Sequence, residues 1–404
     1  MKAMAARAVF FLSAAGFVLV ILGAMMCAAV AFGAEAQPTA SDGRAAAGLG
    51  GPQSKLLMIF YAGSGHTTSR SERFPKLGKL MCMTSGDGGR SWTRPRTIVD
   101  TKADDRDPSV ARLSDGTLLC NFFKTTWNYE RKTAHIRVAV ARSDDGGKTW
   151  AEPQEIETPF DWVAACSAPV VELSDGSLVM PIYGAPLSEH RPKEHYAPHL
   201  KAAVVKSADK GRTWKDFSII TPESAEERSE PAVLELKGGR LFSVIRRNAF
   251  GTFSADKGKT WTPAEKIKAF GGYCYAPDLL RTSSGALVCA HNGVKVNVSI
   301  DEAKTWLPRK QVVKGYGYPS LAELDDGRIL CVFYDDTAEH LKKNTNAEVR
   351  AVTFRVGKAG GVANVSEPWV ILKPDAEAAW GTHPGFPCVV KIRAVNDAAG
   401  DASR

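Results

Sequence analysis

One short motif recurs along the chain, and its repetition limits the possible folds more than any other feature. Its form is Ser-x-Asp-x-Gly-x-[Ser/Thr]-Trp, and its copies occupy residues 85–92, 143–150, 207–214, 254–261 and 299–306, the last with Ala303 in place of the glycine. Each copy is typical of a hairpin turn, because Ser and Asp oxygens accept backbone N–H bonds and Gly adopts positive φ. The copies begin roughly 45 to 65 residues apart, a spacing typical of propellers and other repeat arrays.

A second repeat runs in register with the first. An apolar stretch leads into Leu-x-Asp-Gly or a similar turn and then into another apolar stretch, as in Pro108–Leu119. Each copy predicts two strands joined by a tight turn, and the strands flanking each motif turn complete a unit that must stack on its neighbours around an axis. We therefore predict an all-β fold. It is a six-bladed β-propeller of four-stranded antiparallel blades over residues 55–393, with Lys55–Leu57 as a first, degraded copy.

Composition mainly excludes other classes of protein. The 404 residues carry a formal net charge of +8, but no basic run with interleaved aromatics indicates a nucleic-acid partner. The mild positive surplus suits an anionic glycan. Cys120, Cys289 and Cys331 repeat at one position and predict a small core site rather than a disulfide framework. No Cys/His spacing indicates a metal, so we expect a monomer without cofactors.

The N-terminal segment has the pattern of an export signal. Lys2 and Arg7 precede an uncharged apolar run from Ala8 to Ala34, and Ala34-Glu35-Ala36 offers a small-x-small cleavage site. We predict a signal peptide over residues 1–36, a flexible lead-in over 37–54 and a disordered tail over 394–404. The protein would then be exported, either to the periplasm or out of the cell. The apolar run is also long enough to span a bilayer, so an uncleaved anchor is the alternative.

Aligning the Leu-x-Asp-Gly turns brings unlike residues into one column. A residue at this position begins the first strand of its unit, and the innermost strands of a propeller line its central channel. A position needed only for the fold would keep its residue type, whereas this column varies and so predicts a functional site. The column contains Asp107, Ser167, Glu230, Ala276 and Tyr318, while the neighbouring columns contain Arg106 and Tyr275 in one and Tyr183, Arg246 and Asn292 in the other.

Two of these segments resemble sialidases (neuraminidases), and the recurring turn motif resembles the Asp-box of the sialidase-type BNR-repeat β-propellers. Ser229–Leu241, followed by Arg246, is similar to the segment that carries a catalytic Glu and one Arg of a triad. Gly317–Leu321 is similar to the segment with the nucleophilic Tyr. The resemblance implies that Tyr318 attacks the anomeric carbon, Glu230 takes its proton and Arg246 binds the substrate carboxylate. A neutral phenol suits this attack, because that carboxylate repels an anionic nucleophile.

The chain also departs from the sialidase pattern. Asn292 stands where a third arginine is expected, and only Arg44 is available for the first, which should lie on an inner strand before Leu56. The loop that should carry the acid/base Asp offers only Glu72. By position Asp107 is the best substitute, and we predict that it lies at the channel mouth with an accessible carboxyl and donates the proton, with Glu72 as the alternative.

Three functions remain open from the sequence. The first is an exported sialidase-like glycoside hydrolase that removes terminal acidic sugars with a Tyr/Glu pair. The second is a related propeller enzyme acting on another acidic polysaccharide, with extra cationic residues such as Arg106 or Arg191 at the mouth. The third is a non-catalytic glycan-binding propeller. The candidate substrate-binding residues are Arg246, Arg106, Asn292, Tyr275 and Tyr183, of which the two tyrosines are equally candidates for packing between blades.

Two geometric predictions follow from the same alignment. The Tyr318 hydroxyl and the Glu230 carboxylate should lie in or near hydrogen-bond contact, with Arg246 beside them, because the intervening column position is the small Ala276. A binding-only propeller would keep the two groups too far apart to share a proton. The motif tryptophans should be largely buried and far from Glu230; they are Trp92, Trp150, Trp214, Trp261 and Trp306.

Overall fold

The computed structural model describes residues 55–66, 78–128, 133–189, 199–222, 226–314, 317–335 and 347–392. Within these ranges the chain forms β-strands and two single-turn 3-10 helices, η1 (Leu187–Glu189) and η2 (Lys268–Phe270), without an α-helix. The all-β prediction is therefore confirmed. No helix in this part of the chain is long and apolar enough to cross a membrane. The predicted signal peptide, lead-in and tail lie outside the described residues.

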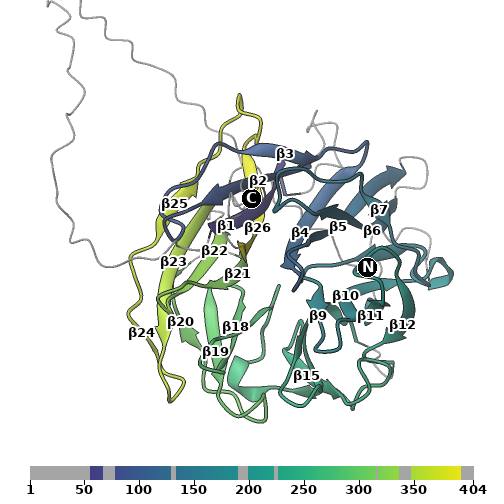
Figure 1. The fold of residues 1–404 in the computed structure, drawn as a ribbon. Coiled ribbons are helices and arrows are strands. Elements are labelled where there is room, and N and C mark those ends of the chain that lie inside the picture. The colour runs from purple at the N-terminus through teal and green to yellow at the C-terminus, as the bar shows by residue number, and fades with distance from the viewer. Residues whose placement is uncertain are drawn as a thin grey trace, which may run out of the picture. The chain divides into compact units, whose positions relative to one another are not determined.

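The strands form five hydrogen-bonded sheets, which Figure 1 shows arranged in chain order around the middle of the molecule. The first sheet has the order β26-β1-β2-β3, formed by β26 (His383–Ile392), β1 (Lys55–Gly63), β2 (Lys79–Ser85) and β3 (Arg96–Val99). The second sheet joins two successive groups of strands, because β6 and β8 pair in parallel between Ile136 and Val163. Its strands are β4 (Asp104–Arg112), β5 (Leu118–Asn128), β6 (Thr133–Ser143), β7 (Gln154–Glu155), β8 (Val163–Ala165), β9 (Val171–Glu172), β10 (Leu178–Ala185), β11 (Lys201–Ser207) and β12 (Lys215–Ile219).

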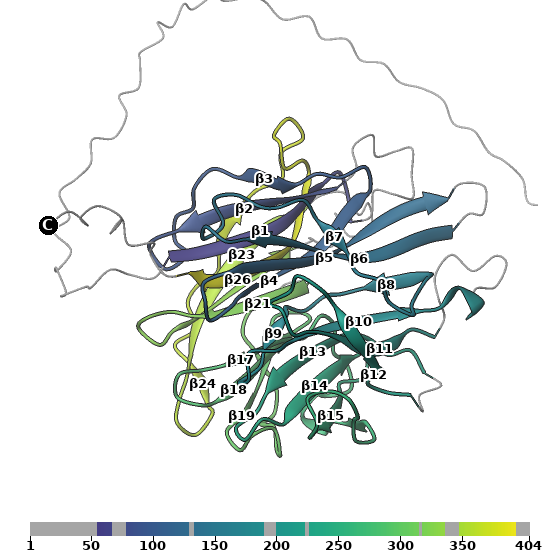
Figure 2. The same ribbon diagram turned by 45° about the vertical axis from the view of Figure 1, so that its right-hand side comes forward.

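The remaining three sheets each follow one stretch of sequence, and every strand pairing in them is antiparallel (Figure 2). The third contains β13 (Ser229–Glu235), β14 (Leu241–Arg246), β15 (Phe250–Ser254) and β16 (Glu265–Lys266), and the fourth contains β17 (Asp278–Arg281), β18 (Leu287–His291), β19 (Lys295–Ser299) and β20 (Lys310–Gln311). The fifth contains β21 (Gly317–Glu323), β22 (Ile329–Asp335), β23 (Glu348–Val356), β24 (Val362–Ala363) and β25 (Trp369–Leu372). The strand groups follow the units predicted from the repeats.

The first sheet unites the two ends of the described chain. Strand β26 pairs with β1 in antiparallel register, with Leu57 opposite Val390, and β26 also packs against β4 and β21 of the neighbouring sheets. Our prediction that the inner strand of this unit precedes Leu56 is wrong, because the C-terminal segment supplies that strand. The partners β1 and β26 lie at opposite ends of the described chain, so their pairing does not follow from the order of the repeats.

The hydrophobic core lies between neighbouring sheets. Leu57 and Ile59 of β1, for example, pack with Val110, Leu118 and Cys120 of the next sheet, and all five side chains are buried. Every cysteine in the described part of the chain is buried and unpaired. The repeated cysteine position is therefore a core site, as predicted.

The motif turns have the predicted chemistry. In the third copy the Ser207 Oγ accepts the Gly211 N–H at 2.9 Å and donates to the Asp209 carboxylate at 2.8 Å, which in turn accepts the Thr213 N–H at 2.8 Å. The hydrogen bonds from Thr213 contribute most to lowering the pKa of Asp209 to about 2. Ala303 replaces glycine in the last copy at φ 61° and still donates its N–H to Ser299 Oγ at 3.0 Å. The hydrogen bonds of these aspartates are those of a turn, so turn chemistry accounts for the repeated Asp.

The tryptophans that end the motif copies differ from the prediction. Only Trp306 is buried; the other four are half-buried, so the expectation of largely buried rings is wrong for them. The indole N–H of Trp92 donates to Gly89 O at 2.9 Å, and Trp150 bonds Gly147 O in the same way at 3.2 Å. Each of these two indoles satisfies its N–H within its own turn, and its ring packs, half-buried, against the hydrophobic core.

Candidate active site

The predicted column coincides with a repeated irregularity of the backbone. In β4, β13, β21 and β26 the pairing register shifts, so that two residues of the strand oppose one of its partner. Such β-bulges bend a strand and re-aim a side chain, often beside an active site. The first residue of each bulge precedes a proline and has positive φ; these residues are Asp107 (47°), Glu230 (46°), Tyr318 (49°) and Phe386 (48°), and Ala276 in the remaining sheet has the same conformation (42°).

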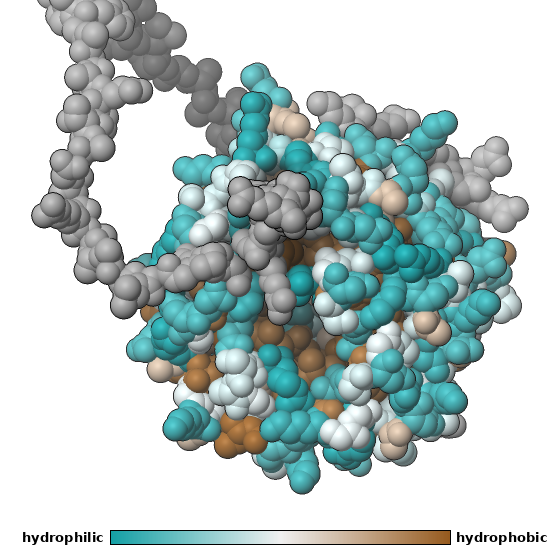
Figure 3. All heavy atoms as spheres, in the orientation of Figure 1, coloured by the Kyte–Doolittle hydropathy of each residue, from teal (hydrophilic) through white to brown (hydrophobic). Residues whose placement is uncertain are grey.

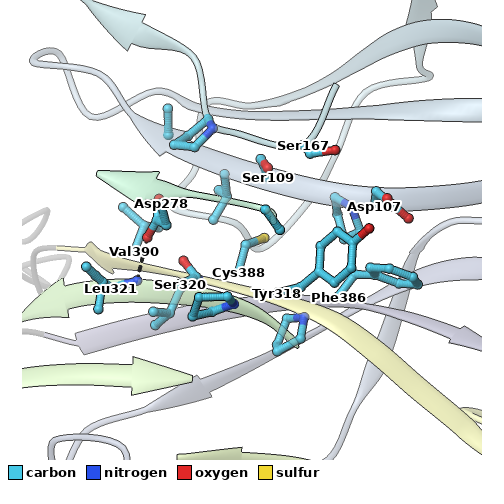
Figure 4. A pocket seen from close by; sticks show the side chains of 18 of the residues that line it. Asp107, Ser109, Ser167, Asp278, Tyr318, Ser320, Leu321, Phe386, Cys388 and Val390 are labelled. Carbon is cyan, nitrogen blue, oxygen red and sulfur yellow. Dashed lines mark hydrogen bonds between the residues drawn. The ribbon is translucent and has the colours of Figure 1, made fainter. Parts of the chain in front are cut away.

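Three of these bulges, in β4, β21 and β26, line one cavity of about 190 Å³ together with Ala276. Figure 4 shows Asp107, Tyr318 and Phe386 together at one side of this cavity, while Asp278 and Leu321 lie at the other. In the face seen in Figure 3 the molecule is hollowed near its centre, with hydrophobic residues inside and hydrophilic ones around. Side chains from different sheets thus meet in a common, partly apolar space.

Tyr318, which lines this cavity, is in contact with Glu230. The Tyr318 hydroxyl donates to Glu230 Oε1 at 3.1 Å, and the Arg246 guanidinium forms an ion pair with the same oxygen. The other oxygen of the carboxylate accepts the Ala276 N–H at 2.8 Å. Glu230 is only 2% exposed. The predicted contact, with Arg246 beside it, is confirmed, while the catalytic roles of these residues stay a prediction.

The electrostatics of the pair keep the proton on the phenol. Burial raises the pKa of Tyr318 well above its ordinary value, and the negative charges of Glu230 and Asp107 raise it further. The hydroxyl is therefore neutral in the resting protein. It can act as a nucleophile only when a base accepts its proton in the same step, and the bonded Glu230 carboxylate is positioned to do so.

Asp107 lines the same cavity but is buried. Its side chain is 5% exposed, and Arg106 Nη2 lies 3.4 Å from its Oδ1. Our prediction of an accessible carboxyl is wrong, because Asp107 sits among Arg106, Tyr318 and Phe386 from three sheets. Burial, together with the charges of Glu230 and Asp104, raises the pKa of Asp107 to about 7, although Arg106 acts in the opposite direction. A carboxyl group with this pKa is partly protonated at neutral pH and can donate a proton.

Of the other predicted residues, Tyr275 contacts Arg246 and Arg106 contacts Asp107. The guanidinium carbon of Arg246 lies 3.8 Å from the centre of the Tyr275 ring. Asn292 accepts the Tyr275 backbone N–H at 3.0 Å and so fixes the segment that carries this ring. Tyr183 is buried opposite Ala165, and Arg106 also lies 3.9 Å from Asp104. Glu72 and Arg191 lie outside the described residues.

Sequence reasoning missed one wall of the cavity. The Phe386 ring is edge-on to Tyr318, with 4.7 Å between ring centres, and Tyr61, Tyr334 and His383 are buried behind it. A signal was available, since Gly385-Phe386-Pro387 repeats the pattern Gly317-Tyr318-Pro319. Because the alignment assigned no C-terminal strand to the first sheet, this copy was overlooked. In the described ranges no cluster of His, Cys, Asp and Glu could hold a metal ion.

Comparison with known proteins identifies the family. The model of the BNR repeat-like domain matches residues 79–331, and the chain belongs to the sialidase-type BNR-repeat family. A sialidase from Paraclostridium sordellii is 27% identical over 205 residues, which are 44% of this chain and 48% of that protein. A sialidase from Bacteroides fragilis (strain YCH46) is 25% identical over 234 residues, covering 51% of this chain and 40% of the relative. The chain thus spans about half or less of the length of these curated relatives.

Solved structures show the same fold at lower identity. The intramolecular trans-sialidase from Ruminococcus gnavus, in complex with oseltamivir carboxylate, has a TM-score of 0.58 at 12% identity, over 76% of this chain and 93% of that one. A protein of unknown function from Dyadobacter fermentans has a TM-score of 0.57 at 19% identity, over 79% and 91%. At these identities the likeness shows the fold alone.

Proposed function

We propose that this protein is an exported, monomeric exo-sialidase-like glycoside hydrolase that removes terminal acidic sugars from glycans. Its sheets would close into a six-bladed propeller, with β26 and β1 joining the two ends of the ring and the cavity at its axis. The single observation that carries the proposal is the hydrogen bond from the Tyr318 hydroxyl to Glu230 at 3.1 Å. A purely binding propeller would have no need for a buried phenol–carboxylate pair at the inner ends of two sheets.

In the first step Tyr318 Oη attacks the anomeric carbon while Glu230 accepts its proton. The bond between the anomeric carbon and the leaving-group oxygen breaks, and Asp107 transfers its proton to that oxygen. The pKa of Asp107, raised to about 7, supports this role, because a carboxyl group with such a pKa is partly protonated at neutral pH. The product of the step is a glycosyl–tyrosine intermediate and a neutral alcohol.

In the second step water attacks the same carbon and Asp107 takes its proton. The bond from the anomeric carbon to Tyr318 Oη breaks, and Glu230 returns its proton to the phenolate. Both groups are then in their starting states, and the two displacements together retain the anomeric configuration.

Arg246 would bind the carboxylate of the cleaved sugar. Its guanidinium is held between the Glu230 carboxylate and the face of Tyr275, and 19% of its side chain remains exposed for a ligand. Guanidinium groups bind carboxylates through paired, charge-assisted hydrogen bonds. The negative charge of Glu230 repels a second carboxylate, so the positive charge of Arg246 is needed for an acidic sugar to bind here.

An enzyme acting on another acidic polysaccharide is the second candidate, and Arg106 is the observation that favours it. Arg106 is a second guanidinium close to Tyr318 and Asp107, as this candidate requires. Its ion pairs with Asp107 and Asp104 nevertheless occupy it within the protein. We therefore favour the first candidate, the sialidase-like glycoside hydrolase.

The test is turnover of an aryl α-glycoside of a sialic acid by the wild type, by Tyr318→Phe and by Glu230→Gln. We expect each variant to lose nearly all activity while its circular dichroism spectrum and unfolding midpoint stay close to wild type. The double variant should be little worse than either single one, because the two residues act as a unit. Full activity of Tyr318→Phe would exclude the mechanism, and turnover only on other acidic glycosides would favour the second candidate.

A further inference from the structure

Tyr273 is an exposed aromatic side chain close to the candidate active site. It is 46% exposed, and it is the one aromatic residue among the large hydrophobic side chains exposed in the described ranges. Its ring lies 4.6 Å from that of Tyr275, with an angle of 47° between the ring planes. We call these two residues the tyrosine ledge.

The ledge is held firmly on both sides. Before it, Phe270 ends η2, is fully buried and stacks on His291 at 5.2 Å between ring centres. Gly271 and Gly272 then turn the chain outward with φ of 71° and 78°, values that glycine adopts without strain. Directly after Tyr273, Cys274 is fully buried, and its N–H donates to Arg247 O at 2.8 Å. Tyr273 is thus fixed at the surface between two buried anchors.

The ledge is continuous with the catalytic pair. The Tyr275 ring covers the guanidinium of Arg246 at 3.8 Å, and Arg246 pairs with the carboxylate that receives the Tyr318 hydrogen bond. An unbroken run of contacts therefore leads from the nucleophile to the exposed Tyr273. Two groups of a sialoside, its carboxylate and its leaving group, are attached to the same anomeric carbon. A surface beside the carboxylate-binding arginine therefore also adjoins the leaving group.

Two opposite charges beside the ledge, Arg247 and Glu227, are paired within the protein. Arg247, which follows Arg246, has a side chain that is 49% exposed, but it pairs with Glu227 at 2.9 Å. Glu227 also accepts a hydrogen bond from Ser229 Oγ at 2.8 Å. An aromatic surface beside a pair of opposite charges suits a ring that presents C–H groups and hydroxyls.

We propose that the tyrosine ledge is the binding site for the leaving-group sugar, a neutral pyranose, so that this protein prefers oligosaccharides to simple glycosides. The proposal rests on the proposed function for its place next to the cleaved sugar. The contact itself is independent of turnover, because it needs only the two rings and a neutral saccharide.

Lactose is the probe for binding, measured by saturation-transfer NMR on the full chain. We expect lactose signals with the wild type and with Tyr273→Phe, which keeps the ring, and their loss with Tyr273→Ala. Ile300→Ala is the matched control, because Ile300 is a 55% exposed apolar side chain in a motif turn outside the ledge. Equal binding by Tyr273→Ala, no binding by the wild type, or stronger binding of glucuronate than of lactose would overturn the proposal.

Kinetics supplies the second arm. For Tyr273→Ala we expect kcat/KM to fall about tenfold on a sialyl-lactose and to stay within about twofold on the methyl glycoside of the same acid, which has no second ring. Equal losses on both substrates would contradict the proposal that the ledge binds the leaving-group sugar, but not the proposed function. If neither substrate is hydrolysed but lactose still binds through Tyr273, the proposed function fails and the ledge stands.

Discussion

Replacing Asp107 with asparagine tests the proton donor, because asparagine keeps the shape of the side chain but cannot give up a proton. The pKa of Asp107 is raised to about 7, first by burial and then by the charges of Glu230 and Asp104. The acid form is the active one for donation, so it prevails below this pH and is lost above it. For the wild type we expect kcat/KM to fall about tenfold per pH unit once the pH is well above 7.

The size of the effect depends on the leaving group. General acid catalysis contributes about 10²- to 10⁴-fold when the departing oxygen needs a proton. Asp107→Asn should therefore lower kcat/KM on a sialyl-lactose by roughly that factor. The aryl group of an aryl glycoside departs as a stabilised phenolate that needs no proton. On this substrate we therefore expect kcat/KM to fall about tenfold or less. The alkaline fall in rate should also disappear from the first step in the variant.

The assay compares pH–rate profiles on the two substrates between pH 5 and 9. Asp278→Asn is the matched control, because Asp278 lines the other side of the same cavity and burial raises its pKa to about 7 as well. It does not lie beside Tyr318 and should leave the difference between the substrates unchanged (Figure 4). An alkaline fall that persists in Asp107→Asn and vanishes in Asp278→Asn would refute the assignment.

Three further predictions follow. Burial raises the folded-state pKa of Asp278 to about 7, so its contribution to stability is present at low pH and is lost as the pH rises through that value. Relative to wild type, the free energy of unfolding of Asp278→Asn should therefore increase by on the order of 3 kcal/mol between pH 5 and pH 8 in urea unfolding. A difference that does not change with pH would contradict this. Ser207→Ala leaves the buried Gly211 N–H without its acceptor and should cost about 1–3 kcal/mol of stability while the activity per folded molecule is unchanged, whereas lost activity at full stability would give the turn another role. Arg246→Lys should raise KM for a sialoside at least about tenfold, because an ammonium cannot bind the carboxylate in a paired fashion, and an unchanged KM would remove Arg246 from the binding site.

The sequence was sufficient to predict the contact between Glu230 and Tyr318 because the repeat aligns equivalent backbone positions. Glu230 and Tyr318 occupy the same place in two sheets, and each lies at the same kind of bulge, from which their side chains come into contact. A local pattern thus determines a long-range contact, since each sheet repeats the local geometry. The contact could be predicted without knowing how the sheets pack in detail.

Features that depend on neighbouring sheets could not be predicted in this way. The burial of Asp107 arises from Arg106, Tyr318 and Phe386, and Phe386 belongs to the C-terminal strand that the alignment left out. Trp92 is half-buried against the core, and its indole N–H bonds Gly89 O within its own turn. Exposure is a property of the assembled structure, and the residue type at one repeat position does not determine it.

The role of Ala276 shows how one backbone device gives different chemistry in different sheets. Each column residue with positive φ costs about 1–2 kcal/mol relative to an ordinary strand conformation, and such strain persists only where the surrounding structure holds it. Glu230 and Tyr318 use this conformation to present side chains. Ala276 instead presents its backbone N–H, which bonds the second oxygen of Glu230 at 2.8 Å and leaves the space between the two longer side chains open. With Arg246 and Tyr318 on the first oxygen, both oxygens of the buried carboxylate are therefore fixed before a substrate arrives.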